Sequence, residues 1–140
     1  MKPGPNRSAA LAGVLLVALA LLAGCAGNGG PRERQAGRLQ LFLDAAGPPV
    51  DSFQFWQLQR WEALGPEHVA VWTRVREVWL IRVRQPCFGL DFARVIALTS
   101  TVNRVSQRFD TVNFEDQRCQ IAEIRPVDAD VIRGGQPDAG

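Results

Sequence analysis

The chain has 140 residues, of which 46% are hydrophobic, and this is enough for one globular domain and too little for two. The formal net charge of +2 comes from the N-terminal segment, since removing Lys2 and Arg7 leaves 14 arginines against 14 acidic residues. Because a nucleic-acid binder usually depends on an excess of basic residues, we expect no nucleic-acid partner.

The first residues have the order of a bacterial signal peptide. Two basic residues precede an apolar run from Ala9 to Ala23, which is shorter than the ~20 residues that span a bilayer as a helix. The run ends in Leu22-Ala23-Gly24-Cys25, which resembles the bacterial lipobox. The resemblance implies cleavage before Cys25, a diacylglyceryl thioether on its sulfur, and acylation of its new amine, for example by palmitate. An ordinary secretory signal with a chance cysteine is the alternative.

The lipobox resemblance also implies a location. Each buried methylene of an acyl chain contributes ~0.8 kcal/mol, so two or three chains would hold the protein on membrane lipid through Cys25. Residue 26 is Ala, whereas Asp at this place resembles an inner-membrane retention signal. We therefore expect the outer membrane, with the domain facing the periplasm and surface exposure left open.

The composition divides the chain into four expected parts. These are a signal peptide over 1–24, a lipidated cysteine with a flexible tether over 25–37, a single β-rich periplasmic domain over 38–133 and a disordered tail over 134–140. The tether is predicted because residues 26–37 contain four glycines and a proline without apolar periodicity.

Alternation of apolar and polar residues predicts mainly β structure for the domain. The predicted strands cover residues 39–43, 50–59, 69–73, 78–83 and 95–99, followed by a closing hairpin of 105–114 with 119–125. Both faces of the 78–83 strand are partly apolar, which suits the inside of a closed or two-layered fold. The predicted fold is a small antiparallel barrel or sandwich-like meander of about six strands.

Two segments fit this scheme less well. Asp51 is a candidate helix N-cap and Gly65-Pro66 a stop, so an α+β fold with a helix at about 52–64 is the alternative to a strand. Residues 88–93, which follow Pro86-Cys87, predict one short helical turn.

A larger set of short motifs extends over most of the domain. They are Trp61-x-x-Leu64-Gly65, Val71-Trp72-Thr73, Cys87-x-x-Leu90 with Phe92-Ala93, Phe109-Asp110-x-Val112 and Cys119-x-Ile121-x-x-Ile124-Arg125-Pro126. With these motifs the chain resembles, from Val50 to about Ile132, a family of small, functionally uncharacterised Gram-negative lipoproteins. The resemblance supports the fold and the compartment and implies no activity.

The residues of the domain give little support for catalysis. His68 is the only histidine, and with two cysteines expected to be oxidised the chain has too few ligands for a zinc site. None of Ser52, Ser100 and Ser106 lies in a Gly-x-Ser-x-Gly motif, and no glycine-rich loop predicts a phosphate or dinucleotide site. We expect no metal and no other cofactor.

Carboxylates leave one catalytic possibility, because glycan cleavage needs a pair about 5–10 Å apart. Asp91, Asp110, Glu115 and Asp116 qualify by residue type only. Turn or strand-edge roles explain Asp110 and Asp116 without catalysis. A small periplasmic hydrolase acting on envelope material, with His68 or such a pair, is therefore the alternative function.

The four tryptophans are the remaining sign of binding. Trp72 and Trp79 lie in apolar strands and are expected in the core. Trp61, which follows Arg60, and Trp56 are candidates for contact with an envelope glycan, lipid or protein. The predicted function is a lipid-anchored, non-catalytic binding or structural module of the envelope.

Cys87 and Cys119 are predicted to form a disulfide. Three cysteines is an odd count, lipidation of Cys25 removes one, and the other two lie in an oxidising compartment. Their wide separation is unlike the Cys-x-x-Cys motif of redox catalysts, so we expect a structural bond. Two buried free thiols are the alternative.

Overall fold

The computed structural model describes residues 29–135. The predicted signal peptide, the lipidation site Cys25 and the first part of the predicted tether lie outside the described residues, as does the predicted tail from residue 136 onward. Within the described range, no helix is both long enough and apolar enough to cross a bilayer.

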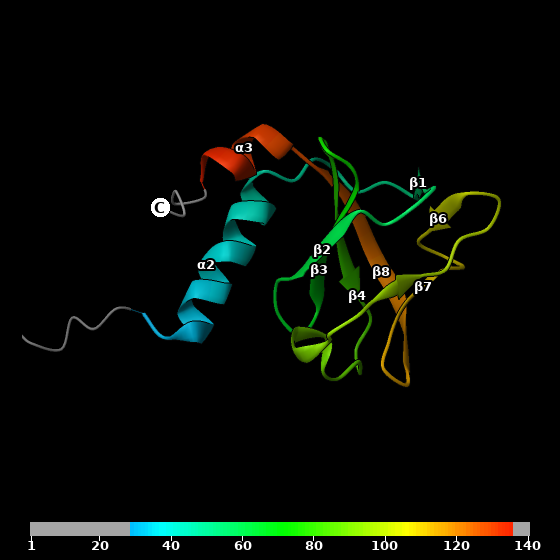
Figure 1. The fold of residues 1–140 in the computed structure, drawn as a ribbon, viewed down its shortest axis with the longest axis horizontal. Coiled ribbons are helices and arrows are strands. Elements are labelled where there is room, and N and C mark those ends of the chain that lie inside the picture. Colours follow the sequence, from blue (N-terminus) through cyan, green and yellow to red (C-terminus); the bar gives the residue numbers. More distant parts are fainter. Residues whose placement is uncertain (1–28, 136–140) are drawn as a thin grey trace, which may run out of the picture. The chain divides into compact units, whose positions relative to one another are not determined.

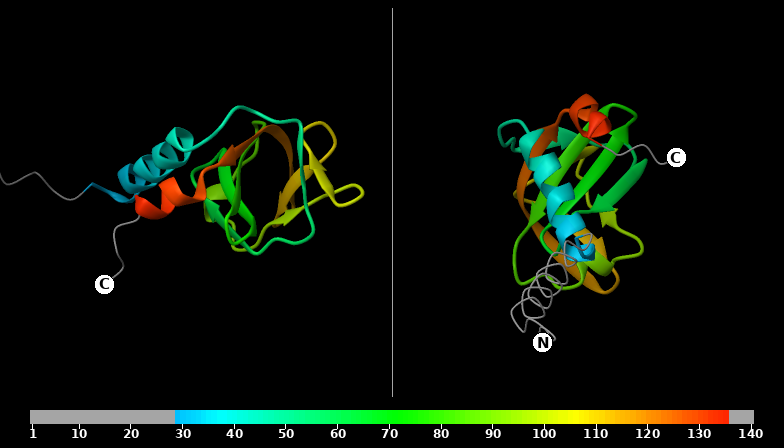
Figure 2. Two further views of the ribbon diagram at one scale, coloured as in Figure 1. Left: turned by 90° about the horizontal axis from the view of Figure 1, so that it is seen from above. Right: turned by 90° about the vertical axis from the view of Figure 1, so that its left-hand side faces the viewer.

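The described domain is mainly antiparallel β structure (Figure 1). Six strands form one sheet, in the order β2 (Arg60–Ala63), β3 (His68–Arg74), β4 (Glu77–Val83), β8 (Gln117–Val127), β7 (Thr111–Phe114) and β5 (Ala97–Leu98). The sheet curves into a half-barrel, which is seen best from above in Figure 2 (left). This confirms the predicted fold class and the predicted strands at 69–73 and 78–83.

A separate two-stranded ribbon consists of β1 (Ser52–Gln54) and β6 (Arg104–Ser106). It lies on the far side of the six-stranded sheet from helix α2 (Pro31–Asp44), as Figures 1 and 2 both show. The short helix α3 (Ala129–Gly134) lies beside α2, and a 3-10 turn, η2 (Leu90–Phe92), confirms the helical turn predicted at 88–93.

The sheet buries apolar side chains on both faces, as the sequence predicts. One face contributes Val69, Val71, Ile81 and Val83 to the inner core of the half-barrel. The other face contributes Ala70, Trp72, Val78 and Leu80 to an outer core that is covered by Phe42 of α2 and Ile132 of α3. Because side chains alternate along a strand, β3 and β4 supply both cores at once.

Residues 31–44 correct two predictions. Residues 31–37, expected in the tether, and residues 39–43, expected as a strand, form one helix. Pro31 is at the first helical position, where its missing N–H costs nothing, and the segment lacks β-branched residues. Leu39 and Phe42 are three residues apart and both contact the outer core. The Leu-x-Leu alternation therefore predicted a strand with a period of two residues, whereas the segment forms a helix.

Residues 50–64 form neither the predicted long strand nor the alternative helix. Only Ser52–Gln54 and Arg60–Ala63 are extended and paired, with β6 and β3 respectively. The predicted 95–99 strand is reduced to β5, and the predicted 105–114 strand is divided into β6 and β7. A turn separates β6 from β7, and Asp110 closes it: its Oδ2 accepts a hydrogen bond of 2.7 Å from the Ser106 backbone N–H, and its own N–H donates to the Ser106 carbonyl at 3.0 Å.

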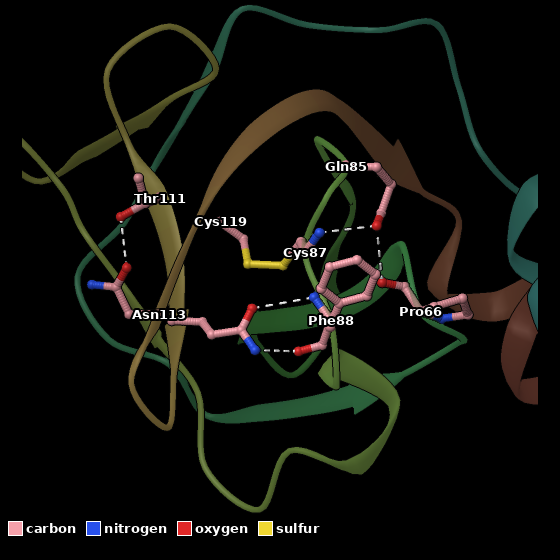
Figure 3. The surroundings of a disulfide bond; sticks show 8 residues. Pro66, Gln85, Cys87, Phe88, Thr111, Asn113 and Cys119 are labelled. Atoms are coloured by element: carbon pink, nitrogen blue, oxygen red, sulfur yellow. Dashed lines mark hydrogen bonds between the residues drawn. A yellow bond between two sulfur atoms is a disulfide. The ribbon is translucent and has the colours of Figure 1, made fainter.

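Cys87 and Cys119 form the predicted disulfide, with their Cα atoms 5.8 Å apart (Figure 3). Both cysteines are buried in the inner core. Next to the bond, the side-chain amide of Gln117 bonds both the backbone N–H and the carbonyl of Phe88. The segment after β4 is thus held against the start of β8 by one covalent bond and two hydrogen bonds.

Candidate functional site: an arginine-lined pocket over Trp72

A pocket of about 330 Å³ opens on the outer face of the sheet, between α2, β2, β3 and α3. Four arginines from these four elements line it, namely Arg38, Arg60, Arg74 and Arg133. Trp72, Gln59, Val75, Ala129 and Ile132 complete the lining. None of the described lining residues is acidic, so the pocket presents guanidinium groups around an apolar surface.

Trp72 forms the floor of this pocket. Trp72 is 8% exposed, and the ring of Phe42 packs perpendicular to the indole, with the ring centroids 5.9 Å apart. The guanidinium of Arg60 lies over the indole, 4.4 Å from the centre of the ring. Arg60 reaches this position because it is the register partner of Trp72 across β2 and β3. A cation over an indole face is a favourable contact.

Arg38 is the most firmly held of the four arginines. Its Nε and Nη2 donate to the two carboxylate oxygens of Glu62, at 2.8 and 3.1 Å. This hydrogen-bonded pair is the main reason why the pKa of Arg38 is raised above its ordinary value. A bidentate arginine–carboxylate pair fixes the orientation of both groups. Arg38 is therefore fixed at the wall of the pocket, and its charge is balanced by Glu62, which does not line the pocket.

The other three arginines have weak partners. Arg60 lies 3.5 Å from Glu62, Arg74 3.5 Å from Glu77, and Arg133 4.0 Å from Asp130. These three arginine side chains are 57–66% exposed. Exposed ion pairs of this length contribute about 0–1 kcal/mol, so their guanidinium donors can turn to an incoming anion at little cost. The pocket can therefore bind a negative group through several arginines at once.

The structure separates the three binding residues that the sequence singled out. Arg60 lines the pocket, whereas Trp61, its neighbour on β2, packs against the inner core on the opposite face. Trp56 is 62% exposed on the connection between β1 and β2, and it does not line this pocket. Trp72 is in a core, as predicted, but the part of its side chain that remains exposed also lines the pocket.

The sequence analysis does not single out Arg38, Trp72, Arg74 or Arg133 as site residues. Arg38 is expected beside a strand, and α3, which carries Arg133, is not expected at all. The only signal in the sequence is an arginine next to a tryptophan, at Arg60-Trp61. The four other residues come together only through the pairing of β2 with β3 and the packing of α2 and α3.

Within the described residues, neither His68 nor Asp110 has the hydrogen-bond partners of a catalytic group. In residues 29–135, no hydrogen bond joins the His68 imidazole to a serine or a carboxylate, and burial lowers the pKa of His68. Asp110 is buried, and its two carboxylate oxygens accept from the Thr99 hydroxyl and the Ser106 backbone N–H. No group of three or more His, Cys, Asp or Glu in the described range could hold a metal ion.

A comparison with known protein families identifies the family of this chain. The model of a family of unknown function, DUF6491, matches residues 8–140. The chain belongs to this family. No curated protein and no solved structure matches it. The match agrees with the resemblance to an uncharacterised family, while the lipobox stays a prediction and the family brings no activity.

Proposed function

We propose that this protein is a lipid-anchored envelope protein and a non-catalytic binding module, whose ligand carries an anionic group that enters the pocket over Trp72. The single observation that supports this proposal is the convergence of four arginines on that pocket without an acidic lining residue. Each of these arginines has a carboxylate neighbour, but all of those carboxylates lie outside the lining, and the four guanidinium groups share one concave site. The volume of about 330 Å³ is within the range of small-molecule sites.

The lining also suggests the chemistry of the ligand. Guanidinium groups bind phosphate and carboxylate in pairs of parallel hydrogen bonds, which favours these two anions. Trp72, Val75 and Ile132 offer apolar surface beside the arginines. A phosphate or carboxylate attached to a flat or apolar body satisfies both parts of the lining, and such a group could come from a lipid headgroup or from a small acid.

Phenyl phosphate is a suitable probe, since it combines an anion with a flat apolar ring. We expect saturable binding of phenyl phosphate to the purified full chain in isothermal titration calorimetry, weakened by added salt because screening reduces the attraction. Arg60→Gln and Arg133→Gln should each weaken binding by about tenfold or more, since each removes a charged hydrogen-bond donor.

The matched control is Arg118→Gln. Arg118 is exposed at the start of β8 and does not line the pocket, so this variant removes the same charge elsewhere. Its affinity for phenyl phosphate should equal that of the wild type. Equal losses in Arg118→Gln and Arg60→Gln would show that binding follows net charge alone, and the proposed site would then be wrong.

The anchor is tested separately through Cys25. The lipobox resemblance and the apolar run before it support lipidation at Cys25, and Ala26 supports the outer membrane. Cys25→Ser should give a protein that either stays uncleaved or becomes soluble, as judged by fractionation and intact mass. A processed Cys25→Ser protein that still fractionates with the outer membrane would contradict the lipid anchor.

A further inference from the structure

A second pocket, of about 530 Å³, lies on the β1–β6 ribbon. This ribbon is on the far side of the six-stranded sheet from α2, which contributes Arg38 to the arginine-lined pocket (Figure 1). The lining of the second pocket is rich in hydroxyl and carboxylate side chains, whereas arginines line the pocket over Trp72. The lining contains three hydroxyl side chains, Ser52, Thr101 and Ser106, together with Asp51, Asp110, Arg104 and Phe109. Two carboxylates face one guanidinium here, so this pocket has a different charge balance from the one over Trp72.

The polar groups of this ribbon pocket retain free hydrogen-bonding capacity. Arg104 donates from Nη1 to the Ser52 hydroxyl at 2.9 Å, which leaves most of its five N–H donors for other partners. The exposed carboxylate of Asp51 accepts no hydrogen bond from any described residue and has no ion pair among them. Donors and acceptors are therefore both present within one cavity.

The backbone around the pocket is held in place by local bonds. Thr101 and Arg104 exchange both backbone hydrogen bonds, at 3.0 and 3.1 Å, across a tight turn. The Asp51 carbonyl accepts from the Gln107 N–H at 2.9 Å, and Asp110 ties Ser106 to Thr99. Asp110 is thus used to position the lining, whereas Asp51 and Arg104 are available to a ligand.

Phe109 adds an apolar surface that the fold does not use. Its side chain is 79% exposed at the rim of the pocket. Val102, at the tip of the Thr101–Arg104 turn, is 91% exposed and has a φ of 52°, which is unfavourable for a β-branched residue. Neither side chain belongs to the core, and a strained backbone such as that at Val102 is found most often near binding and active sites.

We infer that the ribbon pocket binds a neutral oligosaccharide, with Phe109 stacked on a sugar ring and Asp51 and Arg104 bonding its hydroxyls. A pyranose ring has a face of C–H groups that packs on an aromatic ring, and an edge of hydroxyls that both donate and accept. Asp51 can only accept and Arg104 can only donate, so together they match a pair of neighbouring hydroxyls. The excess of carboxylates opposes a negatively charged glycan.

This inference goes beyond the anion-binding proposal, because it concerns other residues and another class of ligand. It also differs from the hydrolase alternative. Glycan cleavage uses two carboxyl groups that flank the scissile bond. In the ribbon pocket the buried Asp110 holds Thr99 and Ser106 through its two oxygens, so we assign Asp110 to positioning and the pocket to binding.

The test uses tetra-N-acetylchitotetraose, maltotetraose and the anionic tetramer of galacturonic acid as probes of the purified full chain in isothermal titration calorimetry. At least one neutral tetrasaccharide should bind saturably, and more tightly than the galacturonic acid tetramer. Phe109→Ala should weaken that binding by about tenfold or more, because the stacked ring is lost. Asp51→Asn should weaken it less, since the amide keeps one acceptor.

Phe92→Ala is the matched control, because Phe92 is 81% exposed on η2 and does not line the ribbon pocket. Its affinity should be unchanged, and unfolding curves should show all three variants folded, as expected for exposed positions. The inference is overturned if neither neutral tetrasaccharide binds at millimolar concentration, or if the anionic tetramer binds best. Equal effects of Phe109→Ala and Phe92→Ala would also overturn it.

Discussion

Trp72 is contacted by two groups of opposite character. The apolar ring of Phe42 packs perpendicular to the indole in the outer core, and the charged guanidinium of Arg60 lies over the indole. A residue that is 8% exposed is therefore a core residue and the floor of the pocket at the same time. At the scale of single residues, burial does not exclude a role in binding, because a ligand needs only the small part of the indole that remains open.

Val102 is expected to limit the stability of the domain. It lies in left-handed backbone conformation, which costs a residue with a Cβ about 1–2 kcal/mol, and it is almost fully exposed. Val102→Asn should stabilise the protein by about 1 kcal/mol in urea unfolding, since Asn tolerates this conformation. Val95→Asn is the control: Val95 is 71% exposed and is not a positive-φ residue, so its change should stay within about 0.5 kcal/mol. A destabilised Val102→Asn would contradict the prediction.

His68 should make stability fall below neutral pH. Burial is the largest cause that lowers the pKa of His68 from its ordinary value of 6.5, and Arg82 acts in the same direction. As the pH falls below about 6.5, the unfolded chain therefore binds a proton before the folded chain does, and the free energy of unfolding decreases. Urea midpoints between pH 7.5 and 5 should decrease more for the wild type than for His68→Gln. Parallel slopes would contradict this prediction.

At the scale of elements, strands were predictable where the apolar residues fit the strand period of two and do not also fit a helical period. Residues of β3 and β4 alternate between two buried faces and are rich in valine and isoleucine, so period and propensity agree. The segment of α2 fits the strand period and the helical period alike. Leu39, Leu41 and Leu43 alternate as in a strand, while Leu39 and Phe42 share a face of the helix. Helix α3 has a signal of its own: Asp128 caps it by accepting from the N–H groups of Asp130 and Val131.

Helix α2 should contribute strongly to stability through Phe42. This side chain is completely buried against Trp72, although most of the helix is exposed. Phe42→Ala should lower the free energy of unfolding by about 3–5 kcal/mol, measured with urea, because it leaves a cavity in the outer core. Leu43→Ala, on the same helix and 38% exposed, should change it by less than about 1 kcal/mol. Similar effects of the two variants would show that α2 is not packed on the sheet in solution.

At the scale of the whole molecule, neither pocket was predictable from the sequence. Arg38 and Arg133 are far apart in the chain and meet only because α2 and α3 pack on the same face of the sheet. Asp51 and Phe109 meet only because β1 pairs with β6, in a register that local patterns do not determine. The sequence does identify residue types that suit binding, such as Arg60. It also identifies the cysteine pair, because the cysteine count and the predicted compartment need no knowledge of register.

The disulfide joins two parts of the fold that the sheet alone connects weakly. The pairing of β4 with β8 ends at Val83 and Ile121. After Val83, the described contacts that hold the chain against β8 are the Arg84–Gln120 backbone hydrogen bond, the disulfide and the two Gln117–Phe88 hydrogen bonds beside it. The separation of 32 residues between the two cysteines gives a loop-closure contribution of about 3–4 kcal/mol.

Reduction of this bond should therefore remove a large share of the stability of the domain. The urea midpoint of the wild type should fall on addition of reductant, and the free energy of unfolding should decrease by about 3–4 kcal/mol. A variant with Cys87→Ala and Cys119→Ala should unfold at a similarly low midpoint and should no longer respond to reductant, which makes it the control. Because the β7–β8 hairpin and the 84–95 segment lose their covalent connection, proteolysis of the reduced protein should begin in these segments. A wild-type midpoint that reductant leaves unchanged would contradict the stabilising role of the bond.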